Sequence, residues 1–210
     1  AMEVLLAMNI KMVSPAAFIE RIFDVPVFCQ LNSRDYCKHK SGESFVRSSF
    51  YASPENYEGD FLKYAKVADV LIAGAYWDPK GPVLFEREDI LKNNFKIRII
   101  ADITCDIKGS IPSTLRSSTI DEPIYDYNPS EDVAELPLTD EGNITVMAID
   151  NLPCELARDA SESFGKELSS NVLPYLLGND TFGMISKATV AEKGRLSDKY
   201  SYLKDYVEGK

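Results

Sequence analysis

The chain has 210 residues, with 33 acidic and 23 basic side chains and a formal net charge of -10 at pH 7. This length suits one domain with a single substantial core. The acidic balance excludes nonspecific binding to nucleic acid or to an anionic membrane surface, because both partners require a basic protein field. No apolar run approaches the ~20 residues that span a bilayer, and no signal-peptide pattern opens the sequence. We therefore expect a cytoplasmic protein with reduced thiols.

Periodicity and helix-breaking residues predict an alternation of helices and strands. In chain order, the first part is expected to contain a helix at 2–8, a strand at 10–14, a helix at 15–23, a strand at 25–31, a polar loop, a helix at 54–67 and a strand at 68–76. The second part is expected to contain a helix at 86–93, a strand at 96–103, an irregular stretch at 108–143, a strand at 144–149, a long amphipathic helix from about 153 and a helix at 197–208.

The strands are almost continuously apolar, which is typical of strands in a covered parallel sheet. Strand 68–76 in particular is expected to be buried on both faces. The alternation with helices indicates an α/β fold, a Rossmann-like doubly wound parallel sheet. We expect residues 1–210 to form one such domain with carboxyl-terminal helices. Because residues 2–8 are already in helical register without a capping residue, we also expect part of the domain to precede residue 1.

Four polar segments follow expected strands. They are "NSR" at 32–34, "YWDP" at 76–79, "DITCDIKGS" at 102–110 and "DNLP" at 150–153. Open α/β sheets bind their ligands at the carboxyl ends of the strands. We therefore expect the four segments to lie along one rim and to form the site.

A metal site is not expected from the cysteines and the single histidine. The four cysteines contain no CxxC pair, and a zinc site needs closely spaced thiolates or imidazoles. Cys29, Cys37 and His39 can be drawn as three ligands, but a strand cysteine and two loop residues are the better interpretation.

Asp102 and Asp106 leave two interpretations open at the end of strand 96–103. Aspartates at strand exits commonly cap loops and helix starts. Alternatively, the strand presents a carboxylate to a bound ligand, and the loop at Gly109 and Ser110 lets the backbone approach it closely. The residues alone favour the capping interpretation.

Two segments carry a resemblance to a known family: "DITCDIKGSIPSTLRSSTIDEPIYDY" at 102–127 and "MAIDNLPCELARDASESFGKEL" at 147–168. They resemble the lysine-ketoglutarate reductase part of bifunctional aminoadipic semialdehyde synthase, and they are similar to lysine-forming saccharopine dehydrogenases. More distantly, they are similar to alanine dehydrogenase and to the soluble part of proton-translocating transhydrogenase.

The resemblance implies hydride transfer between NADP or NAD and the imine of lysine and 2-oxoglutarate, so the partners are a small amino acid and a 2-oxo acid. It also implies that the first strand of the sheet, with its glycine-rich phosphate loop, precedes residue 1, so that the sheet is truncated at its amino-terminal strand. The family's substrate domain, which holds its catalytic lysine and histidine, is then absent as well. We therefore expect the chain alone to be inactive.

For the adenosine end of the cofactor, the resemblance matches Ser33 and Arg34 to a serine–arginine pair. A guanidinium group beside a hydroxyl can hold the 2′-phosphate of NADP, which a carboxylate would repel. Asp35 leaves NAD open, because its carboxylate can hold the ribose hydroxyls instead. The resemblance at Ser33 and Arg34 favours NADP over NAD.

For the nicotinamide end, the resemblance implies that Asp106 is the catalytic candidate, because it matches an aspartate beside the nicotinamide and the substrate. Asp102 is then the structural cap. The remaining cofactor-binding residues implied by the resemblance are Tyr76, Ile103, Ile149, Asp150, Asn151 and Leu152.

Two alternative functions remain. One is an alanine-dehydrogenase-like amino acid dehydrogenase that uses NAD. The other is a non-catalytic Rossmann-like module that regulates or assembles with a partner chain. In either case, a sheet without its first strand exposes an edge and an apolar face, so we expect a homodimer or an exchange of elements between copies.

Overall fold

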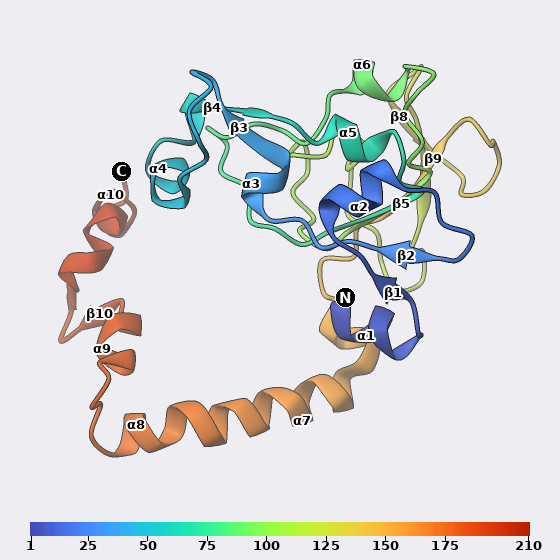
Figure 1. Ribbon diagram of the computed structural model, residues 1–210. Coiled ribbons are helices and arrows are strands. Elements are labelled where there is room, and N and C mark those ends of the chain that lie inside the picture. Colours follow the sequence, from blue (N-terminus) through green and yellow to red (C-terminus); the bar gives the residue numbers. More distant parts are fainter. The chain divides into compact units, whose positions relative to one another are not determined.

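Figure 1 shows the computed structural model of the chain, which describes residues 1–210. The chain divides into two compact units, Ala1–Leu152 and Pro153–Lys210. The first unit contains the large sheet and all the residues proposed above for the site. None of the helices combines the length and the apolar composition that crossing a membrane requires.

A five-stranded sheet forms the centre of the first unit. Its strands, in spatial order, are β5 (Val70–Ala73), β6 (Ile99–Asp102), β9 (Ile144–Met147), β7 (Tyr125–Asn128) and β8 (Val133–Glu135). The strands β5, β6 and β9 are parallel, whereas β7 and β8 run antiparallel to their neighbours. This mixed α/β sheet is consistent with a Rossmann-like fold, so the predicted fold class is confirmed.

One face of the parallel strands is buried and the other is largely open. Leu71 is paired with Ile100, and Ile100 and Val146 belong to the central core. The helices that precede β5 contribute to the same core, which therefore lies on one face only. On the opposite face, Val70 is 50% exposed and its partner Ile99 is 49% exposed. The expectation that strand 68–76 is buried on both faces is therefore wrong.

The smaller elements of the first unit precede or flank this sheet. The helices are α1 (Met2–Ala7), α2 (Pro15–Glu20), α3 (Ser33–Tyr36), α4 (Arg47–Ala52), α5 (Leu62–Ala65) and α6 (Arg87–Ile90), with a 3-10 turn at Pro54–Asn56. The short strands are β1 (Lys11–Met12) and β2 (Val27–Phe28), which are parallel, and β3 (Cys37–His39) and β4 (Tyr57–Gly59), which are antiparallel.

Two further predictions for this unit are wrong. The helix expected at 54–67 is interrupted by β4, because Tyr57 is buried and pairs with His39 of β3. The stretch 108–143, expected to be irregular, contains the strands β7 and β8. The polar composition of this stretch does not predict strands. Tyr125 of β7 is nevertheless buried, and its hydroxyl donates to the Ser113 carbonyl at 2.9 Å.

The second unit is built mainly from helices. It contains α7 (Ala157–Glu167), a π-helical segment (Leu168–Val172), α8 (Leu173–Leu177), α9 (Met184–Ala188), the hairpin of β10 (Ala191–Glu192) and β11 (Arg195–Leu196), a 3-10 segment (Asp198–Leu203) and α10 (Lys204–Val207). A 3-10 segment at Leu152–Leu156 precedes α7. The long helix predicted from 153 therefore starts at 157, and the one predicted at 197–208 is a 3-10 segment followed by a short α-helix.

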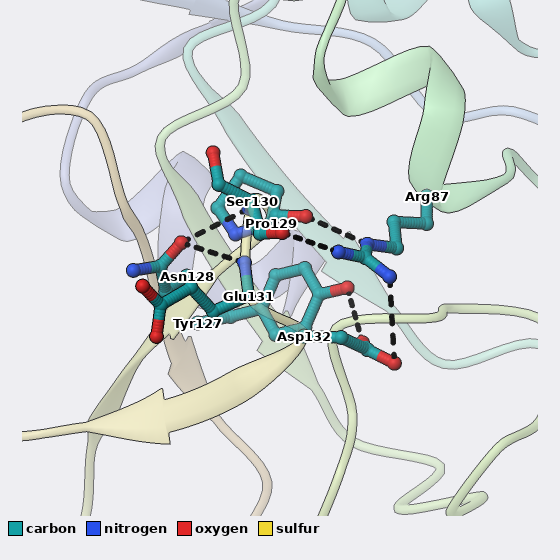
Figure 2. Close-up of polar contacts among 7 residues, drawn as sticks. All are labelled: Arg87, Tyr127, Asn128, Pro129, Ser130, Glu131 and Asp132. Atoms are coloured by element: carbon teal, nitrogen blue, oxygen red, sulfur yellow. Dashed lines mark hydrogen bonds and ion pairs between the residues drawn. The ribbon is translucent and has the colours of Figure 1, made fainter.

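Arg87 ties α6 to the turn between β7 and β8 (Figure 2). Its Nε donates to the Pro129 carbonyl at 2.7 Å, and its Nη2 donates to the Ser130 carbonyl at 2.5 Å. In the same turn, the Tyr127 hydroxyl donates to Asp132 Oδ1 at 2.7 Å. Because β7 runs antiparallel to β9, this turn lies at the amino ends of the parallel strands. The network therefore stabilises the edge of the sheet opposite the expected site.

Candidate functional site

The carboxyl ends of β5, β6 and β9 meet at one edge of the sheet, since these neighbouring strands are parallel. The segments that follow them carry Tyr76, Ile103 with Asp106, and Asp150. The Ile103 amide donates to the Ala73 carbonyl at 2.8 Å, which extends the pairing of β5 and β6 into the loop. Three of the four polar segments singled out in the sequence therefore meet at this edge, which we call the rim.

Several acidic side chains of the rim influence the pKa of the Cys105 thiol. Burial raises the pKa of its thiol. The negative charges of Asp102, Asp150 and Asp106 raise that pKa further. Carboxylates that follow two different strands thus lie near one side chain, which makes this part of the rim acidic.

Asp102 is a structural cap. Its side chain is buried, and its Oδ1 accepts hydrogen bonds from the Thr104 amide at 3.1 Å and the Thr104 hydroxyl at 2.6 Å. Its Oδ2 accepts one from the Thr114 hydroxyl at 2.6 Å. Both carboxylate oxygens are therefore engaged within the protein. They hold the loop after β6 against the segment around Thr114 and do not face a ligand.

Asp106, in contrast, is exposed at the tip of a constrained turn. The Gly109 amide donates to its carbonyl at 2.8 Å, and a Cβ at position 109 would lie 2.5 Å from the Asp106 Cβ. Cys105 and Lys108 adopt left-handed backbone angles, with φ of 52° and 56°. Such conformations are unfavourable for residues other than glycine and cluster at functional sites. The turn thus fixes Asp106 where a ligand can reach it.

The end of β9 is held by Ser118. The Ser118 amide donates to the Ala148 carbonyl at 2.8 Å, and the Ala148 amide donates to the Ser118 hydroxyl at 2.9 Å. Ile149 is buried, so its side chain packs inside the protein and only its backbone is near the rim. Asp150 and Asn151 are exposed, and they offer polar side chains next to the Asp106 loop.

Leu152, the last of the predicted nicotinamide-side residues, is half-buried at the start of the 3-10 segment. Its side chain is therefore only partly available to a ligand.

The loop after β5 places aromatic side chains at the rim. Tyr76 is 87% exposed, and Ile103 of the neighbouring segment is also exposed. Trp77 is half-buried, and its indole Nε1 is buried without a hydrogen-bond partner. An unpartnered buried donor is unusual in a folded protein. Tyr76 and Ile103 are therefore both available to a ligand at the rim.

Ser33 and Arg34 lie in a different place. Together with Phe45 and Arg47 they line a cavity of about 190 Å³, to which no rim residue contributes. Asp35, the proposed alternative ligand for the ribose, accepts a hydrogen bond from the Asn32 amide at 2.7 Å.

Sequence analysis missed Phe45 and Arg47. They follow a polar loop without periodicity, and no motif marks them.

A metal-binding arrangement is not found. No group of three or more His, Cys, Asp or Glu side chains is placed to hold a metal ion, and all four cysteines are free. Burial raises the pKa of Cys37 to about 12. Burial, and then the charge of Asp35, raises the pKa of Cys29 to about 11. Both thiols therefore stay protonated at neutral pH.

Several known proteins are similar to this chain. No family model matches the chain. An alpha-aminoadipic semialdehyde synthase from Arabidopsis thaliana is 32% identical over 183 residues, which cover 83% of this chain and 17% of that protein. The chain is related to these synthases. The resemblance found in the sequence is thereby confirmed.

Mammalian alpha-aminoadipic semialdehyde synthases are also similar to this chain. Those of Mus musculus and Bos taurus are each 28% identical over 183 residues, covering 75% of this chain and 20% of the relative. Both carry the word mitochondrial in their names. The chain spans about a fifth of the length of these synthases.

Proposed function

We propose that the chain is the dinucleotide-binding part of an oxidoreductase that transfers a hydride between NAD(P)H and the imine of lysine and 2-oxoglutarate. The observation that carries this proposal is the meeting of Tyr76, Ile103 and Asp106 at the carboxyl ends of neighbouring parallel strands. Sheets of this class bind their ligands at that edge. The relation to alpha-aminoadipic semialdehyde synthase supports the same assignment.

NADPH or NADH, when bound, supplies the hydride. Tyr76 and Ile103 give the nicotinamide ring an apolar surface to lie on. Asp106 and Asp150 provide negative charge beside it, which attracts a substrate ammonium group and stabilises a protonated imine. The capping bonds of Asp102 keep the loop in this geometry before the ligand arrives, so little ordering is needed on binding.

Because the chain spans only about a fifth of the length of its relatives, cofactor binding is tested before the full reaction. We expect NADPH or NADH to bind in a calorimetric titration, and Tyr76→Ala to weaken binding about tenfold through lost stacking on the ring. Tyr202→Ala, which removes an exposed tyrosine of the second unit, is the matched control and leaves affinity unchanged. Failure of both dinucleotides to bind to the whole protein contradicts the proposal.

The substrate is tested with the whole protein. Oxidation of NADPH in the presence of lysine and 2-oxoglutarate supports the proposed reaction. Oxidation of NADH with pyruvate and ammonia instead supports the amino acid dehydrogenase alternative.

The cytoplasmic location and the homodimer remain predictions. Cell fractionation and light scattering test them, and the mitochondrial names of the mammalian relatives make the mitochondrion the compartment to compare.

A further inference from the structure

One short segment is attached to both of the loops that carry exposed carboxylates at the rim. Residues 113–118, which we call the bridging segment, lie in sequence between the loop after β6 and the strand β7. Thr114 of this segment contacts the loop of Asp106, and Ser118 contacts the loop of Asp150. A single piece of chain can therefore fix the position of one loop relative to the other.

Thr114 attaches the bridging segment to both ends of the turn that carries Asp106. Its hydroxyl donates to Asp102 Oδ2 at 2.6 Å, and its carbonyl accepts the Lys108 amide at 3.2 Å. Asp102 precedes Asp106 in the chain and Lys108 follows it. Thr114 and Asp102 are both buried, so water does not compete for the bond between their side chains. The turn is therefore held in place relative to Thr114.

Ser118 attaches the bridging segment to the end of β9. Its amide donates to the Ala148 carbonyl at 2.8 Å, and its hydroxyl accepts the Ala148 amide at 2.9 Å. Ser118 also forms a parallel bridge with Ile149. Because Ala148 is fully buried, its amide would have no acceptor without the Ser118 hydroxyl, and an unpaired buried amide is unfavourable. The position of Ser118 therefore determines where the chain leaves the sheet towards Asp150.

The centre of the bridging segment is fixed to β7 by Tyr125. The hydroxyl of this fully buried residue donates to the Ser113 carbonyl at 2.9 Å and accepts the Leu115 amide at 3.1 Å. The guanidinium carbon of Arg116 lies 4.7 Å from the centroid of the Tyr125 ring, within the range of cation–π attraction. The segment is therefore anchored to the sheet independently of the two loops that it joins.

We infer that Thr114 and Ser118 are positioning residues, which hold Asp106 and Asp150 at the separation that a bound cationic amino group requires. The inference rests on the proposed function, because it takes the two carboxylates to face the amino substrate. Thr114 and Ser118 are buried, so they act through the loops and not on the ligand. Two carboxylates both attract one ammonium group strongly only when both lie close to it. The bridging segment sets this arrangement before the substrate binds.

The Cys105 thiol allows the arrangement to be measured without a ligand. Burial raises its pKa, and the charges of Asp102, Asp150 and Asp106 raise that pKa further. Iodoacetamide reacts with the thiolate, so the alkylation rate of Cys105 in the 210-residue chain, followed by peptide mass spectrometry, depends on these charges. We expect Ser118→Ala to increase this rate about threefold at pH 8.5, because the Asp150 loop moves away. Ser118→Thr keeps the hydroxyl and should behave as the wild type.

A double-mutant cycle separates the loss of a nearby charge from general loosening of the loop. Asp150→Asn should increase the alkylation rate in the wild-type background and have little further effect in the Ser118→Ala background. An equal effect of Asp150→Asn in both backgrounds overturns the inference. Ser113→Ala, which removes a buried hydroxyl without a partner, is the control and leaves the rate unchanged. If Ser118→Ala does not fold, Tyr125→Phe, which releases the segment from β7 but keeps the ring, takes its place in the cycle.

Kinetics of the whole protein connect this arrangement to the reaction. With lysine, 2-oxoglutarate and NADPH, we expect Ser118→Ala to raise the KM for lysine about tenfold and Ser118→Thr to keep the wild-type value. An unchanged KM for lysine in Ser118→Ala overturns the inference while the proposed function stands. If the wild type shows no turnover, the proposed function fails, and the alkylation cycle still decides whether Ser118 positions Asp150. Thermal unfolding of each variant verifies that the fold is kept.

Discussion

At the scale of single residues, Asp102 and Asp106 show how position decides the role of a carboxylate. Asp102 is buried and accepts three hydrogen bonds, whereas Asp106 is exposed. We predict that Asp102→Ala lowers the free energy of unfolding by about 2–3 kcal/mol, because it leaves the Thr114 hydroxyl and the groups of Thr104 without their acceptor. Urea denaturation measures this loss.

Asp106→Ala is the matched variant. It removes an exposed carboxylate of the same loop, so the free energy of unfolding should change by less than about 0.5 kcal/mol. Similar losses for the two variants would mean that Asp106 also supports the loop, and its assignment to the rim as a ligand-facing group would then be wrong.

At the scale of elements, one side chain joins α6 to the turn between β7 and β8 (Figure 2). Arg87 donates to the carbonyls of Pro129 and Ser130. We predict that Arg87→Ala lowers the free energy of unfolding by about 2 kcal/mol, since hydrogen bonds from a charged donor are stronger than neutral ones. Thermal or urea unfolding measures the change.

Lys92→Ala is the control for Arg87. Lys92 follows the same helix and pairs only with Asp89, and its own side chain is 60% exposed. Exposed ion pairs contribute at most about 1 kcal/mol. An equal effect of both substitutions would show that the bonds of Arg87 to the turn add nothing beyond an ordinary surface charge.

At the scale of the whole molecule, buried thiols make stability depend on alkaline pH. Burial raises the pKa of Cys37 from 9.0 to about 12. The folded state therefore keeps a proton that the unfolded state loses, and the stabilisation present below pH 9 is lost as the pH rises towards 12. One such group gives a slope of about 1.4 kcal/mol per pH unit in that window. Denaturation at pH 8 and pH 10.5 measures it.

Two cysteine variants test the origin of this slope. Cys37→Ala should reduce the loss of stability between the two pH values, whereas Cys154→Ala, at an exposed position, should leave the loss as in the wild type. The prediction fails if Cys37→Ala keeps the full slope. If the slope falls only in part, Cys29, whose pKa burial raises to about 11, contributes the slope that is left.

Continuous apolar runs were sufficient to predict the strands of the parallel sheet and the edge at which polar segments gather. The sheet at β6 and β9 lies where the pattern predicts it. The capping interpretation of Asp102 also follows from its place at a strand end, although the resemblance was needed to separate it from Asp106. These features are local, so a single stretch of sequence contains the information that determines them.

The features that sequence analysis missed depend on contacts between distant residues. The strand β4 forms because Tyr57 is buried against β3, and local propensity at 54–67 favours a helix instead. Val70 and Ile99 are apolar, yet no pattern tells which face of a sheet the helices will cover. Arg47 lines the cavity from the start of α4, after the residue Val46 that Tyr57 holds, and neither its neighbours nor its spacing from Arg34 indicates this.

The lone tryptophan of the chain follows Tyr76 directly and keeps its indole nitrogen buried without an acceptor. Its emission is therefore an intrinsic optical signal from the edge where β5 ends. No dye or label has to be attached, and no other indole contributes background. A molecule that settles on that edge changes the colour or the intensity of this one fluorophore.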